Sequence, residues 1–74
     1  MSQTTPTLDN FLVGVTRYHA DNKDDLRYGQ CLFNALVRLR PDLSEQIRGS
    51  LMDPFYCEKH EVKYELWEWL ATNW

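Results

Sequence analysis

Apolar residues recur at steps of three and four along most of the chain, the spacing of one face of an α-helix. The first such series runs from Leu8 to Tyr18 and predicts a helix over residues 8–19. Thr7 is placed to cap this helix, because its side-chain oxygen can accept a hydrogen bond from a free amide in the first turn. Gly14 lies inside the series, where glycine costs about 1 kcal/mol relative to alanine and often permits another backbone to approach closely.

The widest apolar face follows Asp24 and Asp25, either of which can cap a helix. At about 100° per residue, this face comprises Tyr28, Gly29, Leu32, Phe33, Ala35, Leu36 and Leu39. Such a width predicts the central core helix, and Gly29 within it favours close packing against another helix. The opposite stripe is polar and comprises Arg27, Gln30, Asn34 and Arg38, with Cys31 at its edge.

Prolines mark the next two boundaries. Arg40 ends the second helix, because a residue before proline is kept out of the helical region. Pro41 suits the first position of a short helix over residues 41–48, and Gly49 suits the position after its end. Residues 53–54, Asp-Pro, repeat the start signal and mark a short turn or helix.

The end of the chain is rich in aromatic residues. Phe55 and Tyr56 are predicted to close the end of the core, and a last helix is predicted from about residue 59 to residue 74. Its inner face comprises Val62, Leu66, Trp69 and Leu70. A second apolar arc comprises Tyr64, Trp67, Ala71 and Trp74, and an acidic stripe comprises Glu61, Glu65 and Glu68. We interpret the stripe as a solvated face whose charge can also attract a basic partner.

The apolar positions of this last helix exceed what one flank of a small bundle needs. A stripe of about 100° suffices for such a helix, whereas these positions spread over roughly twice that width. We therefore expect that Trp67 and Trp74 cannot easily both be inside with Trp69. Two interpretations stay open. Either Tyr64, Trp67 and Trp74 form a partner surface, since exposed tryptophan and tyrosine are frequent hot spots, or Trp67 packs on the first helix and Trp74 frays.

Together these patterns predict an all-α fold, a small compact bundle of about four helices, one or two of them short. No strand-like alternation and no Asn-Gly or Asp-Gly hairpin turn is present. Residues 1–6 are predicted to be a flexible lead, and residues 7–74 a single helical domain. A chain of 74 residues is near the lower limit for a self-sufficient core, so a homo-oligomer is a further expectation.

Charge and hydropathy narrow the function mainly by exclusion. The formal net charge is −3, without the basic excess expected of a nucleic-acid binder. No apolar run approaches the roughly 18 to 20 residues of a membrane span, and the first residues lack the features of a signal peptide. We therefore expect a cytoplasmic protein that does not contact a membrane, with Cys31 and Cys57 as reduced thiols.

Cysteine and histidine supply the weak candidates for a metal site or a catalytic dyad. Cys57 and His60 are spaced as Cys-x-x-His, and Cys31 and His19 are also available. Zinc favours four such ligands, usually as two tight pairs, so ordinary thiols and surface histidines are the favoured interpretation over a zinc-binding or thiol-dependent protein. A catalytic dyad would also need an orienting group and an oxyanion site. A bundle this small has little room for them, so we expect no enzyme activity and no cofactor.

Positive charge is concentrated at Arg27, Arg38, Arg40 and Arg48. Arg27 and Arg38 share one helical face, where Gln30 and Asn34 lie between them. This surface supports an alternative function, a nucleic-acid-binding accessory protein. A solvent-facing stripe, with Arg48 paired to a nearby carboxylate, is the favoured interpretation because the chain is acidic.

Four segments carry a resemblance to a known group: RYGQ (27–30), FNAL (33–36), RPDLSEQIRG (40–49) and DPFY (53–56). They resemble a family of small uncharacterised helical proteins encoded mostly by bacteriophages. The resemblance spans about 30 of the 74 residues and implies a small helical protein of phage type without implying any reaction. We therefore expect a non-enzymatic accessory protein that acts by protein–protein interaction on a host or phage component, such as an inhibitor of a host system.

Overall fold

The computed structural model describes residues 6–74, in which four α-helices and one 3₁₀ turn follow one another. The helices are α1 (Leu8–Asn22), α2 (Tyr28–Leu39), α3 (Pro41–Ile47) and α4 (Tyr64–Asn73), and the turn η1 covers Lys59–Glu61. No strand occurs within these residues, so the predicted all-α class is confirmed. The predicted flexible lead lies outside the described residues, apart from Pro6.

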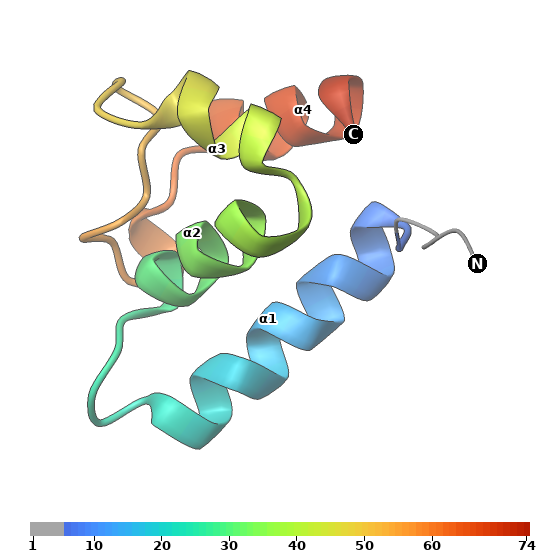
Figure 1. Cartoon of the computed structure of the whole chain (residues 1–74). Helices are drawn as coiled ribbons and strands as arrows, with labels where there is room; N and C mark the ends of the chain where they lie inside the picture. The colour runs from blue at the N-terminus through green and yellow to red at the C-terminus, as the bar shows by residue number, and fades with distance from the viewer. Residues whose placement is uncertain (1–5) are drawn as a thin grey trace.

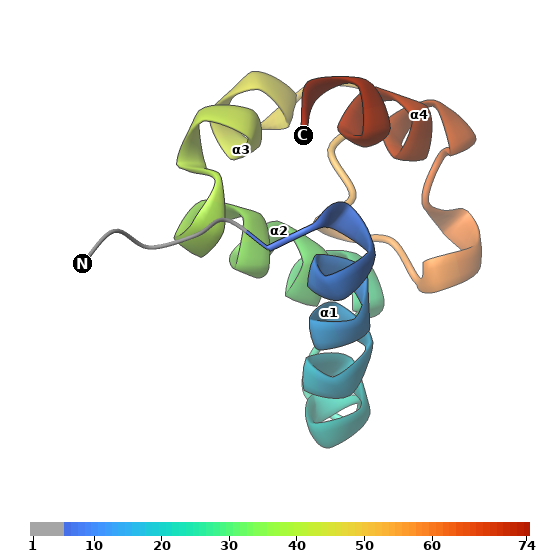
Figure 2. The ribbon, with the colours of Figure 1, turned by 90° about the vertical axis from the view of Figure 1, so that its right-hand side faces the viewer.

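Helix α2 lies at the centre of the molecule. Figure 1 shows α1 on one side of it and α3 with α4 on the other, and Figure 2, turned by 90°, shows the same order. Helix α2 packs against both α1 and α3. The radius of gyration is 11.8 Å, close to the value of about 11 Å expected for a compact chain of this length. The C-terminal half of α1 projects beyond the rest of the bundle (Figure 2).

Helix α1 begins as predicted, because the Thr7 Oγ1 atom accepts a hydrogen bond from the Asn10 amide at 3.1 Å. It continues to Asn22 rather than ending at residue 19. No glycine or proline follows residue 19 to stop it, which explains the extra length. Its fully buried side chains are those of Phe11 and Val15. Most of its surface is therefore left uncovered by the rest of the described chain.

Helix α2 begins at Tyr28, and the side chain of Arg27 at its N-cap position makes no capping hydrogen bond. The predicted capping by Asp24 or Asp25 is therefore wrong, because both lie in the turn that follows the longer α1. The buried residues of α2 are Tyr28, Gly29, Cys31, Leu32, Phe33 and Leu36. Cys31 is fully buried and not at the edge of the polar stripe, since α2 is covered by neighbours on more than one side.

A loop, and not a helix, packs against Gly29. The Gly29 amide donates a hydrogen bond to the carbonyl oxygen of Cys57 at 2.9 Å. A Cβ atom at this position would lie 1.8 Å from the carbonyl oxygen of Pro54 and 2.8 Å from that of Cys57. No side chain fits there, so the predicted close approach at Gly29 is confirmed, whereas a helical partner for it is wrong.

Gly49 follows α3 with a φ of +72°, the left-handed conformation predicted for a residue after a helix end. Asp53 fixes the turn beyond it. Its Oδ2 atom accepts a hydrogen bond from the Gly49 amide at 2.8 Å, and its Oδ1 atom accepts one from the Phe55 amide at 3.0 Å. No helix begins at Pro54, so the Asp-Pro signal marks a turn.

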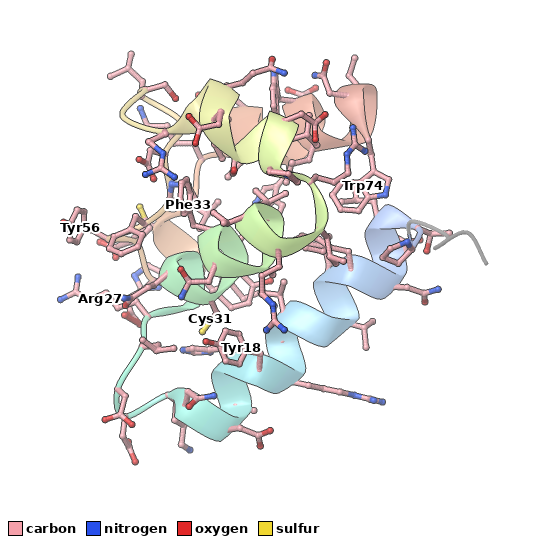
Figure 3. All side chains as sticks on the ribbon, viewed as in Figure 1. Tyr18, Arg27, Cys31, Phe33, Tyr56 and Trp74 are labelled. Atoms are coloured by element: carbon pink, nitrogen blue, oxygen red, sulfur yellow. The ribbon has the colours of Figure 1, made fainter. Side chains whose placement is uncertain are left out.

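Phe55 packs edge-on against Phe33, with ring centres 5.9 Å apart. Tyr56, in contrast, is 78% exposed, so the prediction that it closes the core is wrong. Figure 3 shows Tyr56 at the edge of the molecule beside Arg27, whose Nη1 atom donates a hydrogen bond to the Tyr56 carbonyl at 2.9 Å. The backbone of Tyr56 is therefore fixed at this corner, while its ring packs edge-on against Phe55, with ring centres 5.0 Å apart, and stays largely exposed.

The predicted last helix is divided into two pieces. Turn η1 covers Lys59–Glu61, residues 62–63 are extended, and α4 begins at Tyr64. The Glu61 side chain accepts a hydrogen bond from the Glu58 amide at 2.8 Å, which closes η1 as a single turn. The predicted acidic stripe is therefore split, because only its last two members lie on α4.

All three tryptophans are partly buried against the core. The expectation that Trp67 and Trp74 cannot both pack with Trp69 is therefore wrong, and Trp74 shows the reason. Its ring centre lies 4.7 Å from that of Phe11, and its Nε1 atom donates a hydrogen bond to the carbonyl oxygen of Pro6 at 2.7 Å. The first turn of α1 supplies the cover that a helix pattern alone does not reveal (Figure 3).

Arg40 holds the same tryptophan from the junction of α2 and α3. Its guanidinium lies 5.4 Å from the ring centre of Trp74 and donates hydrogen bonds to the main-chain oxygens of Trp74 and Asn73. It also pairs with Asp42 at 3.0 Å. We refer to Pro6, Phe11, Arg40 and Trp74 as the tryptophan clasp. The clasp joins both ends of the described chain to its middle, so the interpretation in which Trp74 frays is wrong.

Candidate functional site

Two hollows open on opposite sides of α1. The α1/α2 groove has a volume of about 370 Å³ and is lined by Gly14, Val15, Tyr18, Asn34, Ala35, Arg38 and Leu39. The α1/α4 groove has a volume of about 520 Å³ and is lined by Leu12, Val13, Thr16, Arg17, Tyr28, Lys59 and Trp67. Within residues 6–74 no buried side-chain nitrogen or oxygen lacks a hydrogen-bond partner, so no unmet polar group points to an interior site. The grooves are therefore the candidate sites.

The wall of the α1/α2 groove contributed by α1 is open at Gly14. No atom of the described chain lies within 4 Å of a Cβ atom placed on this residue, apart from its neighbours and the helix backbone. The predicted close approach of another backbone is therefore absent within residues 6–74. Tyr18 and Leu39 stand beside this opening with 39% and 47% of their surfaces exposed, and Figure 3 shows Tyr18 on the side of α1 that faces α2. The groove thus combines a small-residue opening with apolar walls.

Two residues of the predicted polar stripe, Asn34 and Arg38, line this groove. Arg38 is exposed and forms no ion pair with any residue of the described chain. Its guanidinium therefore offers several hydrogen-bond donors and a full charge at the edge of an apolar hollow. Of the residues in the predicted polar stripe, these two line a groove together with α1.

The other arginines of the predicted basic set, Arg27, Arg40 and Arg48, make contacts within the described chain. Arg27 donates to the Tyr56 carbonyl and lies 3.9 Å from Glu58. Arg48 pairs with Glu45 at 3.4 Å, as predicted for a nearby carboxylate, and lies 5.3 Å from the ring centre of Phe33. With Arg40 in the tryptophan clasp, three of the four arginines of the nucleic-acid alternative have structural roles. This arrangement does not favour a phosphate-binding surface.

The α1/α4 groove has a different character, because basic side chains border its aromatic floor. The ring of Tyr28 lies beneath the Lys59 ammonium group, 5.5 Å from its centre, and burial raises the pKa of the Tyr28 hydroxyl. Trp67, which sequence spacing placed on a second apolar arc, contributes the α4 side. Trp67 therefore shares a groove with residues of α1, and its predicted packing against the first helix stays a prediction. The groove brings four separate elements of the chain together, α1, α2, η1 and α4.

The remaining predicted site residues lie outside both grooves. Tyr64 is 69% exposed on α4, Gln30 is half-buried on α2, and Trp74 belongs to the tryptophan clasp. No interaction of the described residues links these three into one surface. As partner-binding residues they stay a prediction.

The thiols and histidines form no cluster with the described carboxylates. Within residues 6–74 no group of three or more histidine, cysteine, aspartate or glutamate side chains is placed to hold a metal ion. Burial raises the pKa of the Cys31 thiol, which disfavours the nucleophilic thiolate. His19 instead packs edge-on against Tyr28, with ring centres 5.6 Å apart. Within residues 6–74, Cys57 and His60 therefore have no third side chain with which to hold a metal ion.

Helical spacing alone did not identify several of the residues that line the grooves. Tyr18 and Leu39 fit the apolar faces of their helices, but 39% and 47% of their surfaces stay exposed within the described chain. Arg17 and Lys59 come from separate elements, and no local pattern predicts that they share a groove. Gly14 carried the one usable signal, since a glycine inside a helix needs a reason to be there.

No known protein family, curated protein or solved structure matches the chain. Among residues 6–74, none of the helices combines the length and the apolar character that a membrane span requires. The function is therefore argued from the two grooves themselves.

Proposed function

We propose that this chain is a small non-enzymatic interaction protein that binds a segment of another protein in the α1/α2 groove. The observation that carries the proposal is the open side of Gly14. Glycine in a helix interior costs about 1 kcal/mol relative to alanine. Nothing within the described chain uses the space that its missing side chain leaves. A partner that approaches α1 closely at this point would account for the glycine.

The chemistry around Gly14 supports a protein segment as the occupant. Tyr18 and Leu39 expose apolar surface on either side of the opening, and amphipathic helices bind in grooves of this kind through apolar anchors. Arg38 and Asn34 supply a charge and an amide at the edge, where polar groups give an interface its register. The resemblance to phage-encoded proteins makes a host or phage protein the proposed source of that segment.

The direct test combines affinity capture with substitutions at Gly14. Wild-type protein would be used to capture partners from a lysate of the source cell, and the partner would then be purified and titrated by calorimetry. Gly14→Gln fills the opening with a residue that suits a helix, so we expect it to abolish binding while the fold persists. Ala20→Gln is the matched control, because Ala20 is an exposed α1 residue that lines neither groove.

Loss of partner binding in Gly14→Gln together with full binding in Ala20→Gln would support the proposal. Equal binding by both variants would show that the partner does not use this groove. An Arg38→Ala variant refines the result, because loss of one edge charge should weaken binding by about threefold to tenfold without abolishing it.

A further inference from the structure

The α1/α4 groove carries an inference that is independent of Gly14. Its floor is apolar and aromatic: Leu12 and Val13 come from α1, and Trp67 comes from α4. Val13 is 52% exposed, so this floor is open to solvent. Tryptophan at the base of an open apolar hollow is the kind of anchor that dominates binding energy in protein interfaces.

Two basic side chains border this floor and have no acidic partner among residues 6–74. Neither Arg17 nor Lys59 forms an ion pair with any residue of the described chain. Lys59 keeps its ammonium group over the Tyr28 ring, 5.5 Å from the ring centre, which places its charge on the groove. The net charge of the whole chain is −3, so a groove bordered by two cations is a local reversal of sign. Complementary charge on a partner is what such a reversal favours.

We propose that the α1/α4 groove binds an acidic amphipathic segment of a partner protein. An apolar side chain of that segment packs on Trp67 and Val13, and its carboxylates pair with Arg17 and Lys59. An open hollow with charges only at its border suits a peptide better than a small ligand, because small-ligand sites enclose most of the ligand surface. Two cations on an acidic chain are also few for a nucleic acid, whose binding depends on many phosphate contacts.

The test uses synthetic helical peptides of about 15 residues, the length at which an isolated helix becomes marginally stable. Each peptide carries one leucine or tryptophan anchor flanked by glutamates, and a matched peptide carries glutamine at the same positions. Binding would be followed by nuclear magnetic resonance on the full chain labelled with ¹⁵N. We expect the acidic peptides to shift the indole N–H signal of Trp67 and to leave that of Trp74 unmoved. The glutamine peptides should bind about tenfold more weakly.

Two double variants with reversed charges distinguish binding at a specific site from general electrostatic attraction. The double substitution Arg17→Glu and Lys59→Glu should weaken binding of the acidic peptide by about tenfold or more. Lys23→Glu with Lys63→Glu changes the net charge equally at exposed residues that line neither groove and should leave the affinity within about twofold. Gly14→Gln should not alter binding of the peptide, so the two grooves can succeed or fail separately.

Several outcomes would overturn this assignment. They are an equal loss of peptide affinity in both double variants, equal affinity for the glutamine and the glutamate peptides, or no binding of any acidic peptide. A short DNA oligonucleotide that shifts the same Trp67 signal more strongly than the peptides would assign the groove to nucleic acid instead. Sedimentation that shows a dimer of the wild-type chain, lost in the Arg17 and Lys59 reversal, would assign it to a second copy.

Discussion

Gly14 in α1 and Gly29 in α2 both lie inside helices, but their surroundings are opposite. A methyl group on Gly29 would collide with the carbonyl oxygen of Pro54 at 1.8 Å, whereas a methyl group on Gly14 would meet no atom of residues 6–74 within 4 Å, apart from its neighbours and its own helix backbone. The first glycine is required by the fold, because only a residue without a side chain lets the loop at residues 54–57 reach α2. The second is required by nothing in the described chain. Glycine therefore marks close packing in α2 and an uncovered surface in α1.

The two helices differ in the same way along their whole length. Helix α2 buries six of its twelve residues, and α1 buries two of its fifteen. Burial of apolar side chains is the main source of stability in a domain this small. We infer that α2 with its loop stabilises the fold, while the two grooves that flank α1 are available for binding. The following predictions test that division, beginning with the largest effect.

Gly29→Ala should be the most damaging single substitution on the α2 side. The added methyl group meets backbone atoms that cannot move without breaking the hydrogen bond between the Gly29 amide and Cys57. We expect a loss of about 4 kcal/mol in the free energy of unfolding, a large share of the total for a chain of this size. Urea denaturation followed by circular dichroism measures it. A loss below about 1 kcal/mol would show that the loop is free to shift.

Trp74→Ala should come next. The substitution removes the ring that packs on Phe11 and lies under Arg40, and it leaves the Pro6 carbonyl without its donor. Truncation of a large aromatic residue in a core costs about 3 kcal/mol. Tyr64→Ala is the matched control on the same helix, since Tyr64 is exposed, and it should change stability by less than about 0.5 kcal/mol. Similar losses in the two variants would contradict a special role for the clasp.

Gly14→Ala should have the opposite sign. No atom blocks the added methyl group, and alanine favours the helix by about 1 kcal/mol over glycine. We expect a gain of about that size in the free energy of unfolding and a higher midpoint of thermal unfolding. A decrease would mean that Gly14 has a packing partner after all, and the comparison with Gly29 would fail.

The smallest effect concerns the ion pair that supports the clasp. A side-chain hydrogen bond from Arg40 lowers the pKa of Asp42 below its ordinary value of 3.8. A carboxylate with a lowered pKa stabilises the folded state above its unfolded pKa, and this contribution is lost as the pH falls through the folded value. Asp42→Asn should therefore be less stable than wild type at neutral pH, and the difference should shrink as the pH falls below 3.8 and vanish below the lowered folded pKa of Asp42. Urea midpoints measured across this range would show the convergence; a difference that persists in acid would point to a cause other than charge.

Local signals predicted more of the fold than of the sites. The Thr7 cap, the Pro41 helix start and the left-handed Gly49 depend on neighbouring residues alone, and all three are confirmed. The outward Tyr56 and the partly buried Trp74 depend on which distant segment covers each ring. No local pattern contains that information.

The residues of the candidate sites also differ in whether a local pattern predicts them. Helical spacing identified Asn34 and Arg38 as polar residues that the core does not need, and both line the α1/α2 groove. It did not identify Arg17 or Lys59, because their groove forms only when α1, α2, η1 and α4 meet. Exposed apolar walls such as Leu39 were assigned to the core, since a periodic pattern shows which face is apolar and not whether anything covers that face.

The most direct test of this division is to measure folding and binding in the same Gly14→Gln variant. The account predicts a free energy of unfolding equal to or above that of wild type, together with loss of the partner that wild type and Ala20→Gln both retain. A variant that unfolds more easily than wild type, or one that stays stable and still binds the partner with wild-type affinity, would contradict the claim that the vacant side of α1 exists for binding.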